Sequence, residues 1–196
     1  MVGVAKKYTE IPAAIQPQTE KKPISWETFQ ERYLSREDAY TYEWVNGQVE
    51  KTKRSMDYKQ VFILDNVLNF FEHLKFQQKV KGRLTNEVDT FFKGNHRRPD
   101  MCYLTDDQIR ATKHGVVPVP SFVIEIISNT DKMKRAQTKM LDYWNANVEI
   151  IWHIFPDIQM VHVYHGKKMV VCMGDEICSA SPVLPDFEMT VNEIFK

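Results

Sequence analysis

The sequence has few cysteines, and their positions indicate neither a disulfide framework nor a metal site. Cys102, Cys172 and Cys178 form no CxxC pair, and an odd number cannot all pair within the chain. The sequence also lacks zinc-type Cys/His spacing, an HExxH motif, a glycine-rich phosphate loop and a GxSxG elbow. These absences argue against a zinc enzyme, a P-loop enzyme and a serine hydrolase. A reducing compartment is the simplest interpretation, so we expect a cytoplasmic protein.

Long hydrophobic runs and an excess of one charge are missing as well. No stretch approaches the roughly 18 apolar residues that a membrane span needs, and the N-terminus has no apolar signal region, so we expect neither membrane insertion nor secretion. The 26 basic and 26 acidic side chains give a formal net charge of zero. This balance excludes a generally basic coat for nucleic acid, although a local basic patch remains possible.

What the sequence does contain is enough apolar material for one packed domain. With 196 residues and 43% hydrophobic content, we expect a loose arm over residues 1–22 and a single domain over residues 23–196. Periodicity and turn residues predict helices and strands, with a loop and one helical turn over 105–120. The expected helices cover 25–34, 57–76 and 131–146, and the expected strands cover 40–45, 48–50, 80–92, 99–104, 122–127, 148–155, 160–164 and 168–173. The strand, helix and strand over 122–155 indicate a parallel crossover, hence an α/β fold with a mixed sheet.

A carboxylate lies in the middle of the most apolar strand. Glu125 belongs to the run Phe-Val-Ile-Glu-Ile-Ile over 122–127, where a buried charge is costly without a cation, a proton or a metal. Asp100 follows Pro99 at the start of another strand. Two carboxylates that converge from neighbouring strand ends would suit Mg²⁺, which takes a few carboxylates plus water. The alternative, equally favoured by spacing alone, is that Glu125 forms an ordinary ion pair and Asp100 caps a turn.

Other charged residues are less informative from pattern alone. Lys139 shares one face of its helix with Lys132 and Arg135, and this pattern favours a solvated surface. Glu43, before the Asn-Gly turn of a hairpin, is on its own an unexceptional strand residue. His153 lies in an apolar run, where a hydrogen-bonded core role is commoner than metal binding.

Taken together, several segments resemble the Uma-two family of endonucleases, which is grouped with the PD-(D/E)XK nuclease superfamily. The resemblance runs from about residue 25 to 165. The matching segments are 42–47 (YEWVNG), 98–100 (RPD), 122–128 (FVIEIIS), and the helix with Lys139 that continues to 148–152 (VEIIW) and Pro156.

The resemblance implies a restriction endonuclease-like core, a mixed sheet flanked by helices, with the site at one end of the sheet. It implies that Asp100 and Glu125 are the two acidic residues of the motif and that Glu43 is the glutamate of the early Tyr-Glu motif. The usual lysine two residues after the second acid is replaced here by Ile127, and the resemblance offers Lys139 instead. Mg²⁺ or Mn²⁺ would be held by Asp100, Glu125 and the backbone carbonyl of Ile126.

The hypothesis from these residues is metal-dependent hydrolysis of DNA phosphodiester bonds, and the resemblance implies a homodimer. Basic groups would steer the DNA, namely Lys51, Lys53, Arg54, Arg97, Arg98, Lys132, Lys134 and Arg135. Relatives commonly carry a histidine at the start of the long helix, and this chain has no histidine over 55–60. Relatives also commonly carry a glutamate after the hairpin glycine, and this chain has Gln48 there. These departures favour a competing hypothesis, a nuclease-derived binding or assembly module that no longer cuts. A third hypothesis is a homodimer whose aromatic surface serves assembly alone.

Overall fold

The computed structural model describes residues 22–53, 58–92, 94–127 and 130–196, without the side chains of residues 59 and 130–134. The arm expected over residues 1–22 lies, apart from Lys22, outside the described residues. The division into an arm and one domain therefore stays a prediction.

The larger of the two main sheets has six strands in the order β10-β9-β8-β7-β6-β3. Its strands are β3 (Arg83–Asn86), β6 (Met101–Leu104), β7 (Phe122–Ile126), β8 (Ile150–Phe155), β9 (Met160–His165) and β10 (Lys168–Met173). β7 and β8 pair in parallel, while the other neighbours pair antiparallel. The helix α4 (Thr130–Asn145) connects β7 to β8. The predicted parallel crossover and mixed sheet are confirmed.

A smaller antiparallel sheet has the order β2-β1-β5-β4. Its strands are β1 (Tyr40–Val45), β2 (Gln48–Lys53), β4 (Thr90–Phe92) and β5 (Asn95–Arg97). The first two form the predicted hairpin, because Asn46 and Gly47 adopt the positive φ angles, 49° and 78°, that a tight turn requires. The helical segment that precedes it consists of α1 (Trp26–Phe29) and a π-helical turn η1 (Gln30–Leu34).

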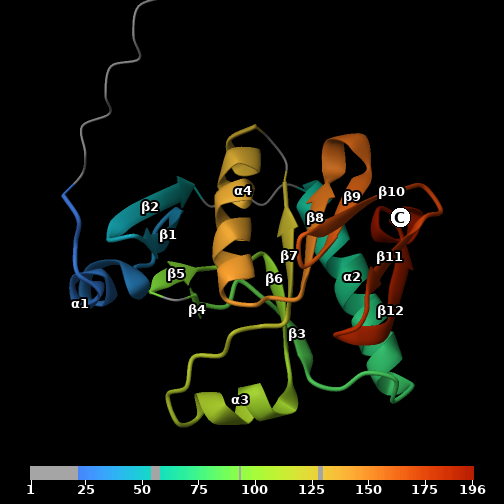
Figure 1. Ribbon diagram of the computed structural model, residues 1–196, viewed down its shortest axis with the longest axis horizontal. Helices are drawn as coiled ribbons and strands as arrows, with labels where there is room; N and C mark the ends of the chain where they lie inside the picture. The colour runs from blue at the N-terminus through green and yellow to red at the C-terminus, as the bar shows by residue number, and fades with distance from the viewer. Residues whose placement is uncertain (1–21, 54–57, 93, 128–129) are drawn as a thin grey trace, which may run out of the picture.

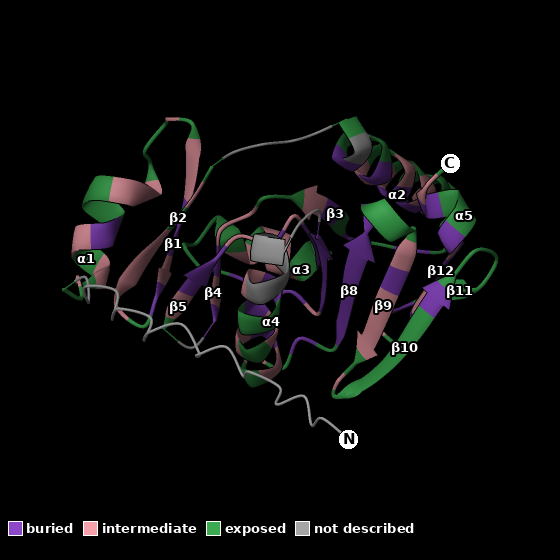
Figure 2. Cartoon of the chain, turned by 90° about the horizontal axis from the view of Figure 1, so that it is seen from above, coloured by how far each residue is buried: buried purple, intermediate pink, exposed green. Residues whose placement is uncertain are grey.

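Helices cover both faces of the larger sheet. The long helix α2 (Tyr58–Phe76) packs on one face together with the hairpin of β11 (Ile177–Ala180) and β12 (Leu184–Thr190) and the short helix α5 (Val191–Ile194). On the other face, α4 packs Tyr143 against Val123 and Ile151. Figure 2 shows α2 and α4 on opposite sides of β8, and in Figure 1 α4 stands between the smaller sheet and the larger one. Residues of both sheets, α2 and α4 line a cavity at the end of β7.

Three regions differ from the expectation. β5 lies between the expected strands 80–92 and 99–104, where no strand was expected. The segment after β6 forms a regular helix, α3 (Asp106–Thr112), which begins with a capping box between Thr105 and Gln108. The C-terminal residues add β11, β12 and α5, which periodicity did not predict. Among the described residues, no helix is long and apolar enough to cross a membrane.

Candidate active site

The carboxylate of Glu125 is buried under α4. All residues of β7 are buried, and alternation along the strand points Val123 and Glu125 toward the helix. The Glu125 side chain accepts hydrogen bonds from Lys139 Nζ, at 3.1 and 3.3 Å, and from the Tyr143 hydroxyl. The buried charge is therefore compensated by two groups from one helix face, since residues four apart lie one above the other.

Lys139 is buried rather than solvated, with 7% of its surface exposed. Its ammonium lies 3.1 Å from Glu43 Oε1 and 3.1 Å from the backbone carbonyl of Arg98, in addition to its contacts with Glu125. The helical pattern, which favoured a surface face, is thus wrong for this residue. The resemblance, which placed Lys139 at the site, agrees with its position.

Asp100 reaches the site because its strand pairs with β7. Met101 of β6 lies opposite Ile124 of β7, which brings Asp100, one residue earlier, beside Glu125. The carboxylate of Asp100 accepts a hydrogen bond of 2.6 Å from the backbone N–H of Ile126. The structure thus places Ile126 at the site through its amide, while a metal-binding role for its carbonyl stays a prediction.

Glu43 enters from the smaller sheet. It is 4% exposed and accepts a hydrogen bond of 2.8 Å from the backbone N–H of Arg98. Its second oxygen lies 3.3 Å from Arg97 Nη1. Glu43 therefore links β1 to the segment between β5 and β6, and Lys139 links both to α4.

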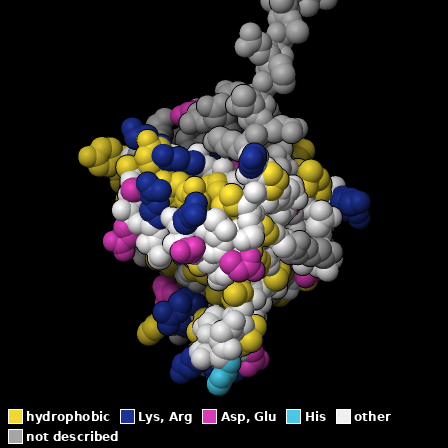
Figure 3. Space-filling model, turned by 90° about the vertical axis from the view of Figure 1, so that its left-hand side faces the viewer, with side chains coloured by type: hydrophobic (Ala, Val, Ile, Leu, Met, Phe, Trp, Pro, Cys, Tyr) yellow, Lys and Arg dark blue, Asp and Glu magenta, His cyan; other side chains and the backbone are white. Residues whose placement is uncertain are grey.

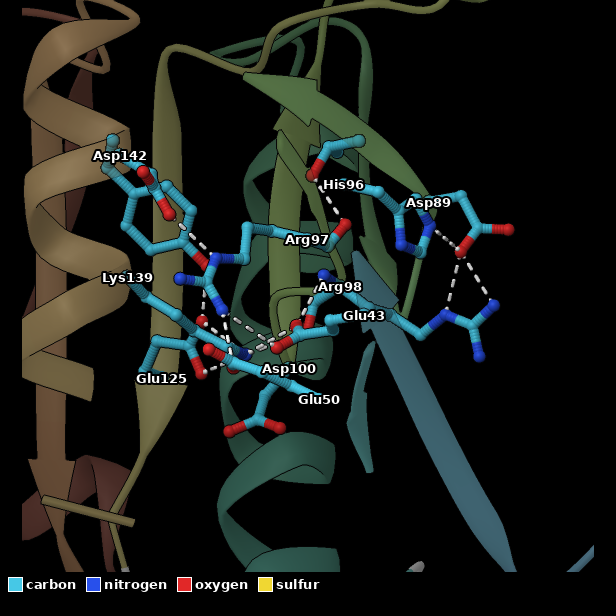
Figure 4. A network of polar contacts seen from close by, with 12 residues as sticks. Glu43, Glu50, Asp89, His96, Arg97, Arg98, Asp100, Glu125, Lys139 and Asp142 are labelled. Atoms are coloured by element: carbon cyan, nitrogen blue, oxygen red, sulfur yellow. Dashed lines mark hydrogen bonds and ion pairs between the residues drawn. The ribbon is translucent and has the colours of Figure 1, made fainter. Parts of the chain in front are cut away.

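Arg97 occupies a different place from the one the sequence predicted. Its side chain is fully buried, and it donates to Glu50 at 2.8 Å and to Asp142 at 2.7 Å as well as to Glu43. The expectation that Arg97 contacts DNA is wrong, because three carboxylates from β1, β2 and α4 hold the guanidinium inside the protein. Figure 4 shows this network beside the four predicted site residues.

The four groups converge on one cavity. In Figure 4 the side chains of Glu43, Asp100, Glu125 and Lys139 point toward one another. They line a cavity of about 430 Å³, together with residues of β2, α2, α4 and the loop after β3. Arg98 and Arg135 also line this cavity, and the Arg98 side chain is paired with Asp89 at 2.6 Å. The site thus brings together residues that lie up to 96 positions apart in the sequence.

Burial and neighbouring charges shift the protonation of the site. Burial raises the pKa of Glu125 to about 7, since the attraction of Lys139 offsets it only in part and Asp100 raises it further. For Glu43 burial acts in the same direction, but Lys139 and Arg97 outweigh it and lower the pKa. Burial opposes the charge of Lys139, yet Glu125 and Glu43 raise its pKa above the usual value. The ammonium therefore stays charged, while the pKa of Glu125 lies above that of a free carboxyl.

The donor set suits a hard divalent cation that keeps most of its waters. Asp100 and Glu125 supply carboxylate oxygens at the cavity, and Mg²⁺ is commonly bound by one or two carboxylates plus substrate phosphates and water. Within the described ranges, no group of three or more His, Cys, Asp or Glu side chains forms a protein-only metal cage. Because the charged donors at the cavity are carboxylate oxygens, the residues fit Mg²⁺ or Mn²⁺ better than a structural zinc ion.

Sequence reasoning missed two contributors to this site. Tyr143 follows Lys139 by one helical turn, and this spacing alone could have indicated that both reach Glu125. Asp142, which holds Arg97 and accepts a hydrogen bond of 2.8 Å from Asn95, carries no such local signal. Of the predicted DNA-steering residues, Lys51 and Lys53 are exposed. Arg54 and the side chains of Lys132 and Lys134 lie outside the described part of the chain.

Comparisons with known proteins bear on the family and the fold of the chain. A search of the curated proteins found no match. A crystal structure from Anabaena variabilis, described as a putative nuclease belonging to DUF820, superimposes with a TM-score of 0.74 at 18% identity. The match covers 88% of this chain and 98% of that one, and at this identity it shows the shared fold. The model of the Uma2 family, described as "Putative restriction endonuclease", matches residues 26–192, well beyond the expected limit at 165. The chain belongs to the Uma2 family.

Proposed function

We propose that this protein is a metal-dependent endonuclease that hydrolyses phosphodiester bonds in DNA. The observation that carries the proposal is the convergence of Asp100, Glu125, Glu43 and Lys139 on one cavity. The family and the structural neighbour support nuclease chemistry in general. Metal dependence and DNA as the substrate are the further steps of the proposal.

Each residue has a distinct role in this mechanism. Asp100, Glu125 and the carbonyl of Ile126 would hold Mg²⁺ or Mn²⁺, which when bound polarises the scissile phosphate and lowers the pKa of a water ligand. Lys139 would orient the attacking water and neutralise charge that develops on the phosphoryl oxygens. Glu43 lies 3.1 Å from the ammonium and would keep it in position.

DNA as the substrate is supported by a local basic surface on the β1–β2 hairpin. Lys51 and Lys53 are exposed on the edge strand β2, and Lys51 Nζ lies 3.6 Å from the centre of the Tyr40 ring. Figure 3 shows Lys and Arg side chains gathered around hydrophobic ones on the side of the molecule that carries this hairpin. Because the net charge is zero, we expect weak and salt-sensitive binding away from the site.

The proposed working form is a cytoplasmic homodimer. The cytoplasm is supported by the three cysteines, which are free and buried. The homodimer is an expectation from the family resemblance.

The proposal is tested with a plasmid-nicking assay in Mg²⁺, Mn²⁺ or EDTA. We expect Asp100→Asn and Lys139→Met each to lower the rate of nicking at least about a hundredfold, as removal of an electrostatic catalytic group commonly does. The matched control is Asp107→Asn, because Asp107 lies on α3 with 89% of its side chain exposed and is expected to leave the rate unchanged. Metal-dependent cleavage that survives Asp100→Asn would refute the assigned site.

A second candidate function is a nucleic-acid-binding or assembly module that does not cut. It is favoured by the contacts of Lys139, which already pairs with both Glu43 and Glu125 and thereby satisfies them without a metal. Titration calorimetry with Mg²⁺ and Mn²⁺ separates the two candidates. If the protein is a non-cutting module, we expect no heat of metal binding and no nicking, although DNA still binds. If it is a nuclease, we expect heat of metal binding and metal-dependent nicking.

A further inference from the structure

The strand β10 forms an open edge of the larger sheet. It is last in the strand order and pairs with β9 alone, from Lys168 opposite His165 to Met173 opposite Met160. Figure 2 shows β10 as an exposed strand on the outer side of β9. An open edge presents unpaired backbone groups and is a template for another strand unless the protein blocks it.

The backbone groups that face outward can be identified from the contacts of Met173. Its N–H donates to the Glu176 carboxylate at 2.8 Å, and its C=O accepts from the Glu176 N–H at 3.0 Å, so both groups point away from β9. In an antiparallel pair, alternate residues direct their N–H and C=O to the same side. Met169 and Val171 therefore also point outward, and no hydrogen bond joins their outward groups to the described part of the chain.

The side chains on this edge are apolar and exposed. The exposed fractions are 49% for Met169, 60% for Val170, 42% for Val171 and 51% for Met173. Charged residues, which usually protect an edge strand, are absent from the middle of β10. They lie only at its ends, with Lys167 and Lys168 before the apolar run and Asp175 and Glu176 after it.

We propose that β10 pairs antiparallel with β10 of a second copy of this chain, with the two-fold axis at Val170. In this register Met169 of each copy lies opposite Val171 of the other, so the outward N–H and C=O groups of both residues are satisfied. Val170 faces its own symmetry mate, and the basic end of each strand meets the acidic end of the other. The occupant is a second copy because the reversal of charge along one strand is complementary to itself only under such a two-fold axis.

The pairing has a consequence for the two candidate sites. A two-fold axis that relates antiparallel neighbours stands perpendicular to the sheet, so the same face of both sheets points in one direction. α4 lies on that face in each copy, the cavity lies beside it at the end of β7, and β8 and β9 separate the cavity from the interface. The interface therefore leaves both cavities uncovered, and the same two-fold axis relates the two sites.

The proposal is tested by light scattering after size exclusion of the full chain. We expect a wild-type dimer, and Val170→Lys is expected to weaken it at least about a hundredfold, because two ammonium groups would meet at the axis. The control Val119→Lys, at an exposed valine outside β10, is expected to leave the dimer intact. Circular dichroism establishes that the variants are folded.

A cysteine at the axis tests the register without disrupting the strand. Directly opposite residues that exchange no backbone hydrogen bonds lie close enough for a disulfide, so Val170→Cys is expected to cross-link under mild oxidation and Val119→Cys is not. A monomeric wild type would overturn both the homodimer and its surface. A dimer that survives Val170→Lys, or whose Val170→Cys variant does not cross-link, would overturn the surface alone. None of these outcomes bears on the nuclease activity, which is measured separately by plasmid nicking.

Discussion

Replacement of Arg97 by methionine should be among the most destabilising single changes in this protein. The guanidinium is fully buried and holds Glu43, Glu50 and Asp142, whose side chains are 5%, 33% and 14% exposed. Loss of one partner from a buried ion pair costs about 3–5 kcal/mol, because the remaining charge stays buried. Glu50 can turn to solvent, while Glu43 keeps Lys139 and Asp142 keeps Asn95. We therefore expect the lower end, a loss of about 3 kcal/mol in the free energy of unfolding at neutral pH.

The measurement is urea unfolding at several pH values, with Arg110→Met as the control. Arg110 pairs with Asp107 at the surface, with 67% and 89% of the two side chains exposed, so we expect its loss to cost at most about 0.5 kcal/mol. The pKa of Glu43 is lowered from 4.5 in the folded state, so its ion pairs stabilise the protein above that pH and are lost as the pH falls. The difference between Arg97→Met and wild type should therefore shrink below pH 4.5. A loss under about 1 kcal/mol at pH 7 would refute the account of Arg97.

Three further predictions follow from individual residues. Gly82→Ala is expected to lower the free energy of unfolding by about 2–4 kcal/mol, because the new Cβ would lie 2.4 Å from the Leu104 carbonyl oxygen at a φ of +77°. The control is Gly115→Ala, at a φ of +76° in open space, which should lower it by about 1 kcal/mol in the same urea assay. Burial lowers the pKa of His153 from 6.5 to about 4, so its neutral form stabilises the fold above pH 6.5 and this stability is lost as the pH falls toward 4. His153→Phe should therefore remove on the order of 3 kcal/mol of the acid sensitivity in that range, and an unchanged pH profile of unfolding would contradict this. The pKa of Glu125, raised to about 7, predicts roughly tenfold tighter Mg²⁺ binding at pH 8 than at pH 6 by calorimetry, because protons compete for the carboxylate.

Much of the fold could be predicted because its elements have regular apolar periods and clear turn residues. The hairpin around Asn46-Gly47, the helix α2 and the crossover from β7 to β8 were all visible in the sequence. The helix α3 was missed although Thr105 and Gln108 have the spacing of a capping box, which is a usable signal. The β11–β12 hairpin was harder, because the apolar Ile177 is exposed in β11 and two successive exposed residues, Pro185 and Asp186, interrupt the alternation in β12.

The candidate site could be predicted only where the family resemblance supplied the long-range pairing. Local pattern placed Lys139 on a solvated face, since nothing within its helix indicates that Glu43 and Glu125 cover it. Arg97 was placed on the DNA-binding surface for a similar reason. Its three carboxylate partners lie 45 to 54 residues away, and a three-residue strand gives no periodicity from which burial could be inferred.

The lysine at the cavity comes from the helix that follows the acidic strand, and this makes the site sensitive to the length of the chain between the two. Lys139 follows Glu125 by 14 positions, and the two are carried by separate elements, a strand and the next helix. An insertion or deletion between them would rotate α4 by about 100° per residue and carry the lysine away, while both acidic residues stayed in place. Homologous chains should therefore be compared by the number of residues between the acidic strand residue and the helical lysine. A search for a lysine two residues after the acidic residue would discard this chain.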